Sequence, residues 1–251
     1  MKPRFTVVVP TYERPAALRA CLGALAALDY PRDDFEVVVV DDGSRTPIAA
    51  GDLSVMDGVA LRVLRTENGG PGAARNLGAA AAEGRYLAFT DDDCRPERGW
   101  LRGFDAALAR TPTAMIGGRT VNALGRNPWA ATSQLIVAMA YAFYNADPAH
   151  ARFFAANNMA VPADVFAAVG GFRADVFRVA SEDRELCDRW RHAGHGLAYA
   201  PAAVVAHAHD LDVASFCRQH FRYGRGAMRF HQLRMQRHSG RLRQDMWFHV
   251  Q

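Results

Sequence analysis

Three consecutive carboxylates, Asp91, Asp92 and Asp93, are the residues of this sequence best placed to do chemistry. They follow the apolar run 86–89, which predicts a buried strand because polar residues do not alternate within it. Three adjacent charges cannot continue a buried strand, so we expect the strand to end here and present them to a ligand. Carboxylate oxygens bind hard cations such as Mg²⁺ or Mn²⁺. A solvated acidic turn is the alternative interpretation.

The elements that must position this triplet alternate between strands and helices. β-branched and apolar runs predict the strands, and leucines at helical spacing predict a helix. The expected strands cover residues 5–9, 35–40, 59–64 and 86–89, and the expected helices cover 15–28 and 73–83. This order predicts an α/β fold with a mostly parallel, doubly wound (Rossmann-like) sheet and helices on both faces.

Polar residues follow three of the expected strands. They are Thr11-Tyr12-Glu13, Asp41-Asp42 and Asp91-Asp92-Asp93. Because parallel strands end at the same edge of a sheet, we expect the three groups to converge there. One polar strand end is usually a turn, but three at one edge indicate a binding site.

The second half of the chain has a less regular pattern. Its expected helices cover 100–109, 129–145 and 164–169, with another from residue 182, and its expected strands cover 114–118, 157–161 and 197–205. Ser181 has the side chain of an N-cap for the helix that Glu182 and Asp183 begin. Asn157 and Asn158 are the polar residues best suited to recognition here, although asparagines in loops often only cap backbone groups.

Composition limits the class of protein and its location. Half of the 251 residues are hydrophobic, so the chain can bury a sizeable core. The four cysteines are far apart and form no C-x-x-C pair, which argues against a zinc site or disulfide framework and for a reducing compartment. We see neither a signal peptide nor an apolar run long enough to span a membrane, and we therefore expect a cytoplasmic protein.

Several short motifs, in this order and spacing, resemble those of family 2 glycosyltransferases, the inverting enzymes of the GT-A fold. They are residues 9–14 (VPTYER), 40–44 (VDDGS), 72–76 (GAARN), 89–93 (FTDDD), 170–172 (GGF), Glu182-Asp183 and His207. Each motif alone is weak, but together they extend from residue 5 to about residue 230. The resemblance implies a nucleotide-sugar donor, a divalent metal and transfer with inversion of the anomeric centre.

The resemblance also implies roles for individual residues. On the nucleotide side it places Pro10, Thr11, Tyr12 and Glu13 along the base and ribose, Asp42 on the base, and Arg75, Asp91 and Asp92 in the same pocket. Arg75 could instead be a solvated helix residue or pair with an acid. Metal ligands would be Asp93, Asp91 and His207, and the Asp91–Asp93 triplet matches the D-x-D motif. Asp183, with Glu182, matches the general base. Apart from the resemblance, Asn157 and Asn158 are the best polar candidates on the acceptor side, roughly residues 115–180.

The donor and acceptor implied by the resemblance remain general. Uridine diphosphate is the commonest donor nucleotide of the family, and guanosine and thymidine nucleotides also occur. A glycan or lipid-linked acceptor would fit synthesis of cell-envelope polysaccharide or glycolipid. The later Q-x-x-R-W motif is matched only in part by residues 218–224, which argues against processive polymer synthesis.

The chemistry itself requires two carboxylate sites, and the chain has two. An acceptor hydroxyl is a poor nucleophile, so a carboxylate must take its proton as the bond forms. The leaving diphosphate accumulates charge, which a bound cation stabilises. A nucleotidyltransferase is the alternative enzyme, but it would commonly carry a glycine-rich loop with a lysine after the first strand. Residues 10–15 have no lysine, and Lys2 is the chain's only one.

We predict a single GT-A domain over residues 1–215, with a nucleotide-binding half (1–95) and an acceptor-side half (96–215). A basic helical extension would follow over 216–251. It contains the arginines at positions 218, 222, 225, 229, 234, 237, 241 and 243, whereas the rest of the chain is net acidic.

The first four of these arginines recur at helical spacing. We expect this segment to contact an anionic surface, the inner face of a membrane, as a peripheral protein would. The alternative is a solvated helix whose arginines pair with the acidic body. A nucleic-acid-binding module is a more remote alternative, and no nucleic acid partner is expected.

Overall fold

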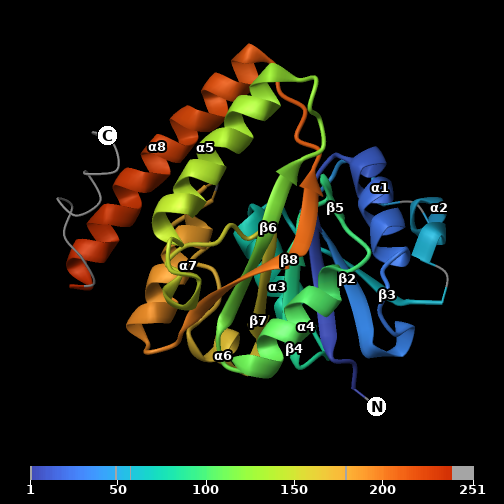
Figure 1. Ribbon diagram of the computed structural model, residues 1–251. Coiled ribbons are helices and arrows are strands. Elements are labelled where there is room, and N and C mark those ends of the chain that lie inside the picture. Colours follow the sequence, from blue (N-terminus) through green and yellow to red (C-terminus); the bar gives the residue numbers. More distant parts are fainter. Residues whose placement is uncertain (1, 49, 57, 179, 239–251) are drawn as a thin grey trace.

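A computed structural model describes residues 2–48, 50–56, 58–178 and 180–238 of the chain. Its described residues form one sheet of eight strands in the order β3-β2-β1-β4-β7-β6-β8-β5 (Figure 1). The strands are β1 (Phe5–Thr11), β2 (Phe35–Asp41), β3 (Ala60–Arg65), β4 (Tyr86–Thr90), β5 (Cys94–Pro96), β6 (Met115–Asn122), β7 (Asn158–Pro162) and β8 (Leu197–His207).

Helices cover both faces of this sheet (Figure 1). They are α1 (Pro15–Ala26), α2 (Ala50–Leu53), α3 (Pro71–Ala80), α4 (Trp100–Arg110), α5 (Pro128–Tyr144), α6 (Ala163–Ala168), α7 (Glu182–His192) and α8 (Val213–Gln236). Short 3₁₀ turns occur at η1 (Arg32–Asp34), η2 (Ser54–Met56) and η3 (Pro148–His150). The predicted α/β class with a mostly parallel sheet is confirmed, since β5 and β7 alone run against the other described strands.

The buried strands contribute side chains to cores on both faces. Val7 and Val9 of β1 belong to one core, and Val8 belongs to the other, because successive side chains of a strand point to opposite faces. On the first face, α1 adds fully buried residues such as Leu22. Burial of one such leucine stabilises the fold by about 1.5–3 kcal/mol. The second face carries Trp190 of α7.

Strand register brings the carboxyl ends of β1, β2 and β4 to one edge. Thr11 is paired with Asp41 across β1 and β2, and Val8 is paired with Phe89 of β4. Each of these strands therefore ends within a few residues of the same line. The polar groups that follow the strands meet there, as the sequence predicts.

Two details differ from the sequence-based expectation. Ser181 is not a side-chain N-cap: its φ is 72°, and its side chain makes no capping hydrogen bond to α7. The helix of the expected extension begins at Val213, so the boundary predicted between residues 215 and 216 falls inside α8. The arginines of the expected extension at positions 241 and 243 lie outside the described residues.

The helices α5 and α8 lie side by side along one flank of the molecule (Figure 1). The rings of Trp129 and Phe216 are 5.4 Å apart, and Gln219 Nε2 donates to Ser133 Oγ at 3.2 Å. Asp212 caps the N-terminus of α8 by accepting from the backbone N–H of Ser215. This packing makes α8 part of the folded body.

Acids of α7 fix the other end of α8. Arg234 pairs with Asp188, and Arg237 pairs with both Glu185 and Asp188. These two arginines follow the alternative expectation, in which the basic segment pairs with the acidic body. Among the described helices, none combines the length and the hydropathy that crossing a bilayer requires.

Candidate active site

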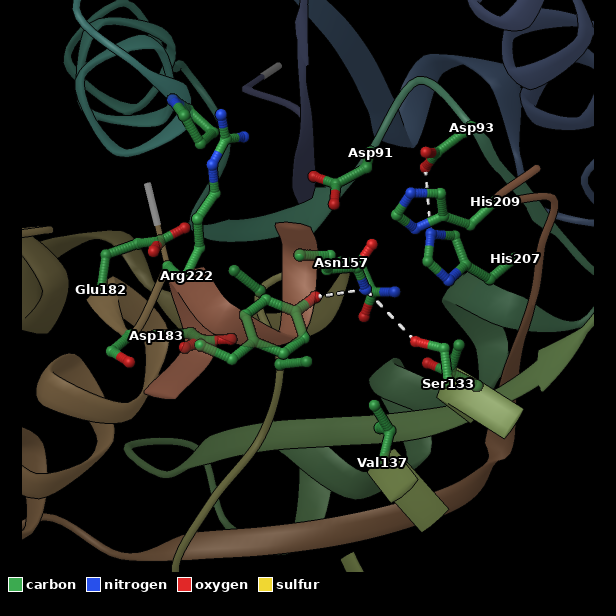
Figure 2. A pocket seen from close by; sticks show the side chains of 18 of the residues that line it. Asp91, Asp93, Ser133, Val137, Asn157, Glu182, Asp183, His207, His209 and Arg222 are labelled. Carbon is green, nitrogen blue, oxygen red and sulfur yellow. Dashed lines mark hydrogen bonds and ion pairs between the residues drawn. The ribbon is translucent and has the colours of Figure 1, made fainter. Parts of the chain in front are cut away.

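A cavity of about 740 Å³ opens at the edge where the strands end. Most of the residues singled out from the sequence line it: Pro10, Thr11, Tyr12, Asp42, Arg75, Asp91, Asp93, Asn157, Glu182, Asp183 and His207. Figure 2 shows Asp91, Asp93 and His207 on one side and Glu182 and Asp183 on the other. Glu13, Asp92 and Asn158 are not part of this lining. The two carboxylate clusters therefore face a common space.

Asp93 lies between an imidazole and a guanidinium. His207 Nε2 is 3.3 Å from Asp93 Oδ1, and Arg14 Nη1 donates to Oδ2 at 2.7 Å. The sheet produces this contact, since β5 pairs with β8 so that Cys94 is opposite His207. Burial acts to raise the pKa of Asp93, but the hydrogen bond and charge of His207 and the charge of Arg14 outweigh it and lower that pKa.

A carboxylate and an imidazole this close fit a divalent cation such as Mn²⁺. Asp93, Cys94 and His207 bring ligand atoms within 4.8 Å of one another. Cys94, however, is fully buried in the apolar core, and burial, with the charges of Asp91 and Asp93, raises the pKa of its thiol well above the usual value. A protonated thiol is a poor ligand, so the fitting donors are Asp93 and His207.

Asp92 differs from its expected role on the nucleotide. Its side chain is buried, accepts from Thr11 Oγ1 at 2.7 Å and lies 2.7 Å from Arg14 Nη2. Burial raises the pKa of Asp92 to about 7, against the opposing effects of Arg14 and Thr11. Asp92 thus braces the end of β1 and orients Arg14.

Asp42 lines the cavity, but its carboxylate is already occupied. It accepts from the backbone N–H of Gly69 at 2.8 Å, from that of Gly70 at 2.9 Å and from Asn68 Nδ2 at 3.2 Å. Gly70 has a φ of 89°, and a Cβ there would overlap the carbonyl of Arg178, so only glycine fits. Asp42 shapes the loop before α3, and its contact with a base stays a prediction.

Glu13 joins the ends of β1 and β2 and does not face the cavity. Its carboxylate accepts from the backbone N–H of Arg45 at 2.7 Å, and its own N–H donates to Ser44 Oγ at 2.9 Å. Ser44 in turn donates its N–H to Asp41 Oδ1. The expected contact of Glu13 with the ribose has no support in this geometry, because these interactions hold the residue in the turn.

Arg75 connects the two carboxylate clusters. Its Nη2 donates to Asp91 Oδ1 at 2.6 Å, and its Nη1 donates to Glu182 Oε1 at 3.2 Å. The side chain is buried, and its guanidinium lies 5.5 Å from the ring centroid of Phe172. Of the expectations for Arg75, pairing with an acid is confirmed, and the sequence did not identify which acids it joins.

Asp183 has the environment of a general base. It lies at the start of α7 and accepts from the backbone N–H of Arg184 at 2.7 Å. Burial and the nearby charge of Glu182 raise the pKa of Asp183 to about 7. A carboxylate with a pKa near neutrality is basic enough to take a proton and is still ionised to a substantial extent at neutral pH. Ala180 and Ser181, both with positive φ, form the turn that leads into these acids.

The two neighbouring asparagines have different environments. Asn157 lines the cavity, and its Oδ1 is buried without a hydrogen-bond partner among the described residues. The predicted acceptor-side role of Asn158 is wrong for this geometry. Its amide is fully buried, accepts from Trp100 Nε1 at 2.8 Å and donates to the carbonyls of Arg119 and Ala203. Asn158 therefore joins strands and α4.

Residues of α8 complete the cavity, although the predicted domain boundary assigned most of this helix to an extension outside the GT-A domain. Its lining includes Arg218, Gln219, Arg222 and Tyr223. Gln219 Nε2 donates to the hydroxyl of Tyr223 at 3.0 Å, and burial beside Asp183 raises the pKa of that hydroxyl. The partial match to Q-x-x-R-W was the signal in the sequence for these positions.

The model of the family described as "Glycosyl transferase family 2" matches residues 6–174. The chain belongs to this family. A pre-mycofactocin glycosyltransferase of Mycobacterium tuberculosis is 32% identical over 227 residues, which is 88% of this chain and 46% of the relative. The poly(ribitol-phosphate) β-N-acetylglucosaminyltransferase TarS of Staphylococcus aureus is 39% identical over 92 residues, or 36% of this chain and 16% of TarS. The chain thus spans about half or less of these relatives.

Solved structures of glycosyltransferases have the same fold. The mannosyltransferase PcManGT of Pyrobaculum calidifontis, in complex with GDP-Man and Mn²⁺, has a TM-score of 0.73 and 22% identity, covering 94% of this chain and 65% of that one. S. aureus TarS 1–349 in complex with UDP has a TM-score of 0.64 and 20% identity, covering 88% of this chain and 73% of that one. These likenesses confirm the predicted GT-A fold.

Membership in glycosyl transferase family 2 confirms the family predicted from the motifs. The family match ends at residue 174, before the Glu182-Asp183 pair, His207 and α8. For this family member, the roles of those later residues therefore depend on the geometry of the cavity.

Proposed function

We propose that this family 2 member transfers a sugar from a nucleotide-diphosphate sugar to an acceptor hydroxyl, with inversion. The observation that carries the proposal is the arrangement of two carboxylate clusters around one cavity, joined by buried Arg75. One cluster suits a metal-bound diphosphate and the other suits proton removal from the acceptor. The GDP-Man and UDP complexes of neighbours support a nucleotide-sugar donor.

The metal of this proposal is Mn²⁺ or Mg²⁺, held by Asp93 and His207, with Asp91 nearby. When bound, it stabilises negative charge on the leaving diphosphate. Arg14 must release Asp93 Oδ2 before that oxygen can bind a cation, because it now donates to it at 2.7 Å. Arg218 and Arg222 line the same cavity and supply further positive charge near the leaving group.

Asp183 takes the proton of the acceptor hydroxyl as that oxygen attacks the anomeric carbon. The attack is in line with the leaving diphosphate, which inverts the configuration. A pKa of about 7 leaves a substantial fraction of Asp183 ionised at neutral pH. Arg75 holds Glu182 in place, and the unpartnered Oδ1 of Asn157 is suited to accept a hydrogen bond from a hydroxyl of the acceptor.

The acceptor of the proposal is a glycan or a lipid-linked molecule, and the donor is a UDP-sugar. The acceptor-side wall of the cavity contains Ile136, Val137 and Ala140 from α5 and Phe153 from the loop after it. This apolar wall suits a hydrophobic acceptor group. We place the enzyme in the cytoplasm, in synthesis of cell-envelope polysaccharide or glycolipid.

Two measurements test the proposal. The first is a thermal-shift screen of nucleoside diphosphates with and without Mn²⁺, because a ligand that binds only the folded state raises its melting temperature. We expect the largest shift with UDP and Mn²⁺ together. The second is product analysis with UDP-sugars and candidate acceptors. Free nucleoside diphosphate and an inverted anomer support the proposal, whereas release of pyrophosphate would mean nucleotidyl transfer.

A further inference from the structure

Exposed apolar side chains of the described residues are concentrated on α5 and α8. Nine of the twelve large hydrophobic residues with high exposure belong to these two helices. They are Trp129, Leu135, Ile136 and Met139 on α5, and Val213, Phe221, Tyr223, Met228 and Met235 on α8. Ile136 and Tyr223 also line the cavity, so the other seven make up the surface considered next. Isolated surface hydrophobics are ordinary, but a group on two adjacent helices indicates an interaction surface.

Helix α5 has the composition of a core helix but is not enclosed. Its 17 residues include no charged side chain, and only Ala130, Ser133 and Tyr144 are buried. Leu135 is 61% exposed and Met139 is 57% exposed. The inner face of the same helix lines the cavity through residues such as Val137. The outer face therefore has apolar side chains and, among the described residues, nothing that covers them.

Helix α8 adds positive charge to this surface. Phe221 is 68% exposed and Met228 is 58% exposed, and Arg225 and Arg229 are exposed beside them. The helix contains no acidic residue. Arg234, farther along α8, and Arg237, just after it, turn toward acids of α7.

Arg225 and Arg229 make no ion pair within the described part of the chain. Arg234 and Arg237 thus contact the protein body, whereas Arg225 and Arg229 are exposed to solvent.

We propose that the outer faces of α5 and α8 dock on an anionic membrane. The apolar side chains would enter the boundary between headgroups and acyl chains, and Arg225 and Arg229 would pair with lipid phosphates. Because the inner faces of both helices line the cavity, docking would hold the cavity beside the bilayer. An acceptor that is anchored in lipid would then be within reach.

A second copy of the chain fits this surface less well than an anionic bilayer does. In a two-fold symmetric interface the same patch meets itself. Because neither α5 nor α8 contains an acidic residue, Arg225 and Arg229 would meet no carboxylate on the opposing helices. Like charges brought together at an interface oppose association. Anionic lipids have the complementary charge and accept apolar side chains as well.

The experiment is co-sedimentation of the full chain with vesicles. We expect binding to vesicles of phosphatidylcholine with phosphatidylglycerol, little binding to phosphatidylcholine alone, and weaker binding at high salt, which screens the arginines. The double variants Leu135→Gln/Met139→Gln and Arg225→Gln/Arg229→Gln should each reduce binding on the order of tenfold. None of these four residues lines the cavity.

Matched controls keep the result specific. Val63→Gln changes an apolar residue of β3 that is 39% exposed, and Arg110→Gln removes an exposed arginine at the end of α4. Both should bind vesicles as the unaltered chain does. Circular dichroism and melting temperature would establish that every variant is folded.

Two outcomes overturn the proposal. One is an unaltered, folded chain that does not bind anionic vesicles, and the other is folded α5 and α8 variants that bind as well as the controls. If sedimentation instead shows a dimer that the α5 and α8 variants convert to a monomer, without vesicle binding, the surface joins two copies. Nucleotide-induced thermal shifts are recorded on the same samples. They test the donor site separately, so failure of membrane docking would leave the proposed transfer reaction intact.

Discussion

The proposed donor side and the proposed acceptor side of the cavity are built in different ways. On the proposed donor side, the carboxylates of Asp42, Asp92 and Asp93 each contact two or more polar or charged groups of the protein. On the acceptor side, Asn157 Oδ1 and Glu182 Oε2 are buried without hydrogen-bond partners among the described residues. Unsatisfied buried polar atoms are costly, so they persist where a ligand completes them. The comparison indicates a preorganised donor site opposite a side that the acceptor completes.

The largest effect is expected from Asp183→Asn on the acceptor side. The amide keeps the shape of the side chain but cannot take a proton, and loss of a general base reduces the rate by about 10²–10⁴-fold. Nucleotide binding should be unchanged, because the donor side is intact. Steady-state transfer rates and UDP-induced thermal shifts measure the two effects. Asp164→Asn, at an exposed position of α6, is the control.

The pH dependence sharpens this first prediction. Since burial raises the pKa of Asp183 to about 7, the transfer rate should decrease as pH falls below that value, and Asp183→Asn should lose this dependence. The effect of pH on stability has the opposite sign to its effect on the transfer rate. A carboxylate with a raised pKa in the folded state destabilises the fold above its unfolded pKa, so acidification through pH 7 should stabilise the protein. A variant that retains near-normal transfer would remove Asp183 from the mechanism.

The contrast also separates what sequence could reveal from what it could not. The edge at which the cavity opens was predictable because parallel strands end there, and Asp91 follows directly after β4. The pair Asn157 and Asn158 shows the limit. Adjacent residues of an extended segment point to opposite sides, and the pattern does not say which side faces the core. Packing decides this, and it places Asn158 against Trp100.

The role of α8 was hidden for a related reason. The arginines at 218, 222, 225 and 229 have a helical period, but the arginines that pair with the protein body are Arg234 and Arg237. The partners of these two belong to α7, far away in sequence. Helical spacing defines faces without identifying what each face contacts. The positive φ of Ser181 was equally hidden, since serine before two acids is typical of an N-cap. Long-range packing, absent from local patterns, determined both features.

The bridge between the two sides should be the next most sensitive feature. Arg75→Met removes one partner of a buried ion pair and leaves Asp91 and Glu182 without their cation. Such a loss costs about 3–5 kcal/mol of unfolding free energy. Denaturant unfolding measures it, and addition of Glu182→Gln to Arg75→Met should restore part of the loss. Arg102→Met, which breaks a solvent-exposed pair with Asp29, should cost far less because solvent screens that pair.

A result in which Arg75→Met and Arg102→Met have equal cost would show that the bridge contributes little to the fold. The transfer rate of folded Arg75→Met then becomes the informative measurement. A large decrease in rate with little change in stability would mean that Arg75 acts mainly on the substrates.

A smaller effect is expected from Arg14→Met, which frees Asp93 on the donor side. Arg14 now competes with a cation for Asp93 Oδ2, and a half-exposed ion pair is worth about 0–1 kcal/mol. Without nucleotide, the variant should therefore bind Mn²⁺ up to about fivefold more tightly. Electron paramagnetic resonance of free Mn²⁺ measures this. Arg65→Met is the matched control, since Arg65 is similarly exposed and pairs with Asp41. Equal or weaker Mn²⁺ binding by Arg14→Met would argue against competition.

The last prediction concerns Asp42→Ala, and it tests whether the proposed donor side is preorganised. The substitution leaves the N–H groups of Gly69 and Gly70 without their acceptor, which costs about 1–3 kcal/mol if both remain buried. The loop before α3 would then be less well fixed, so UDP binding should weaken while its dependence on Mn²⁺ persists. Thermal shifts without ligand, with UDP, and with UDP and Mn²⁺ separate these effects. Asp42→Asn keeps one oxygen acceptor, so its stability and its UDP affinity should lie between those of the unaltered chain and those of Asp42→Ala. If stability drops but UDP affinity does not change, Asp42 shapes the loop and takes no part in binding the base.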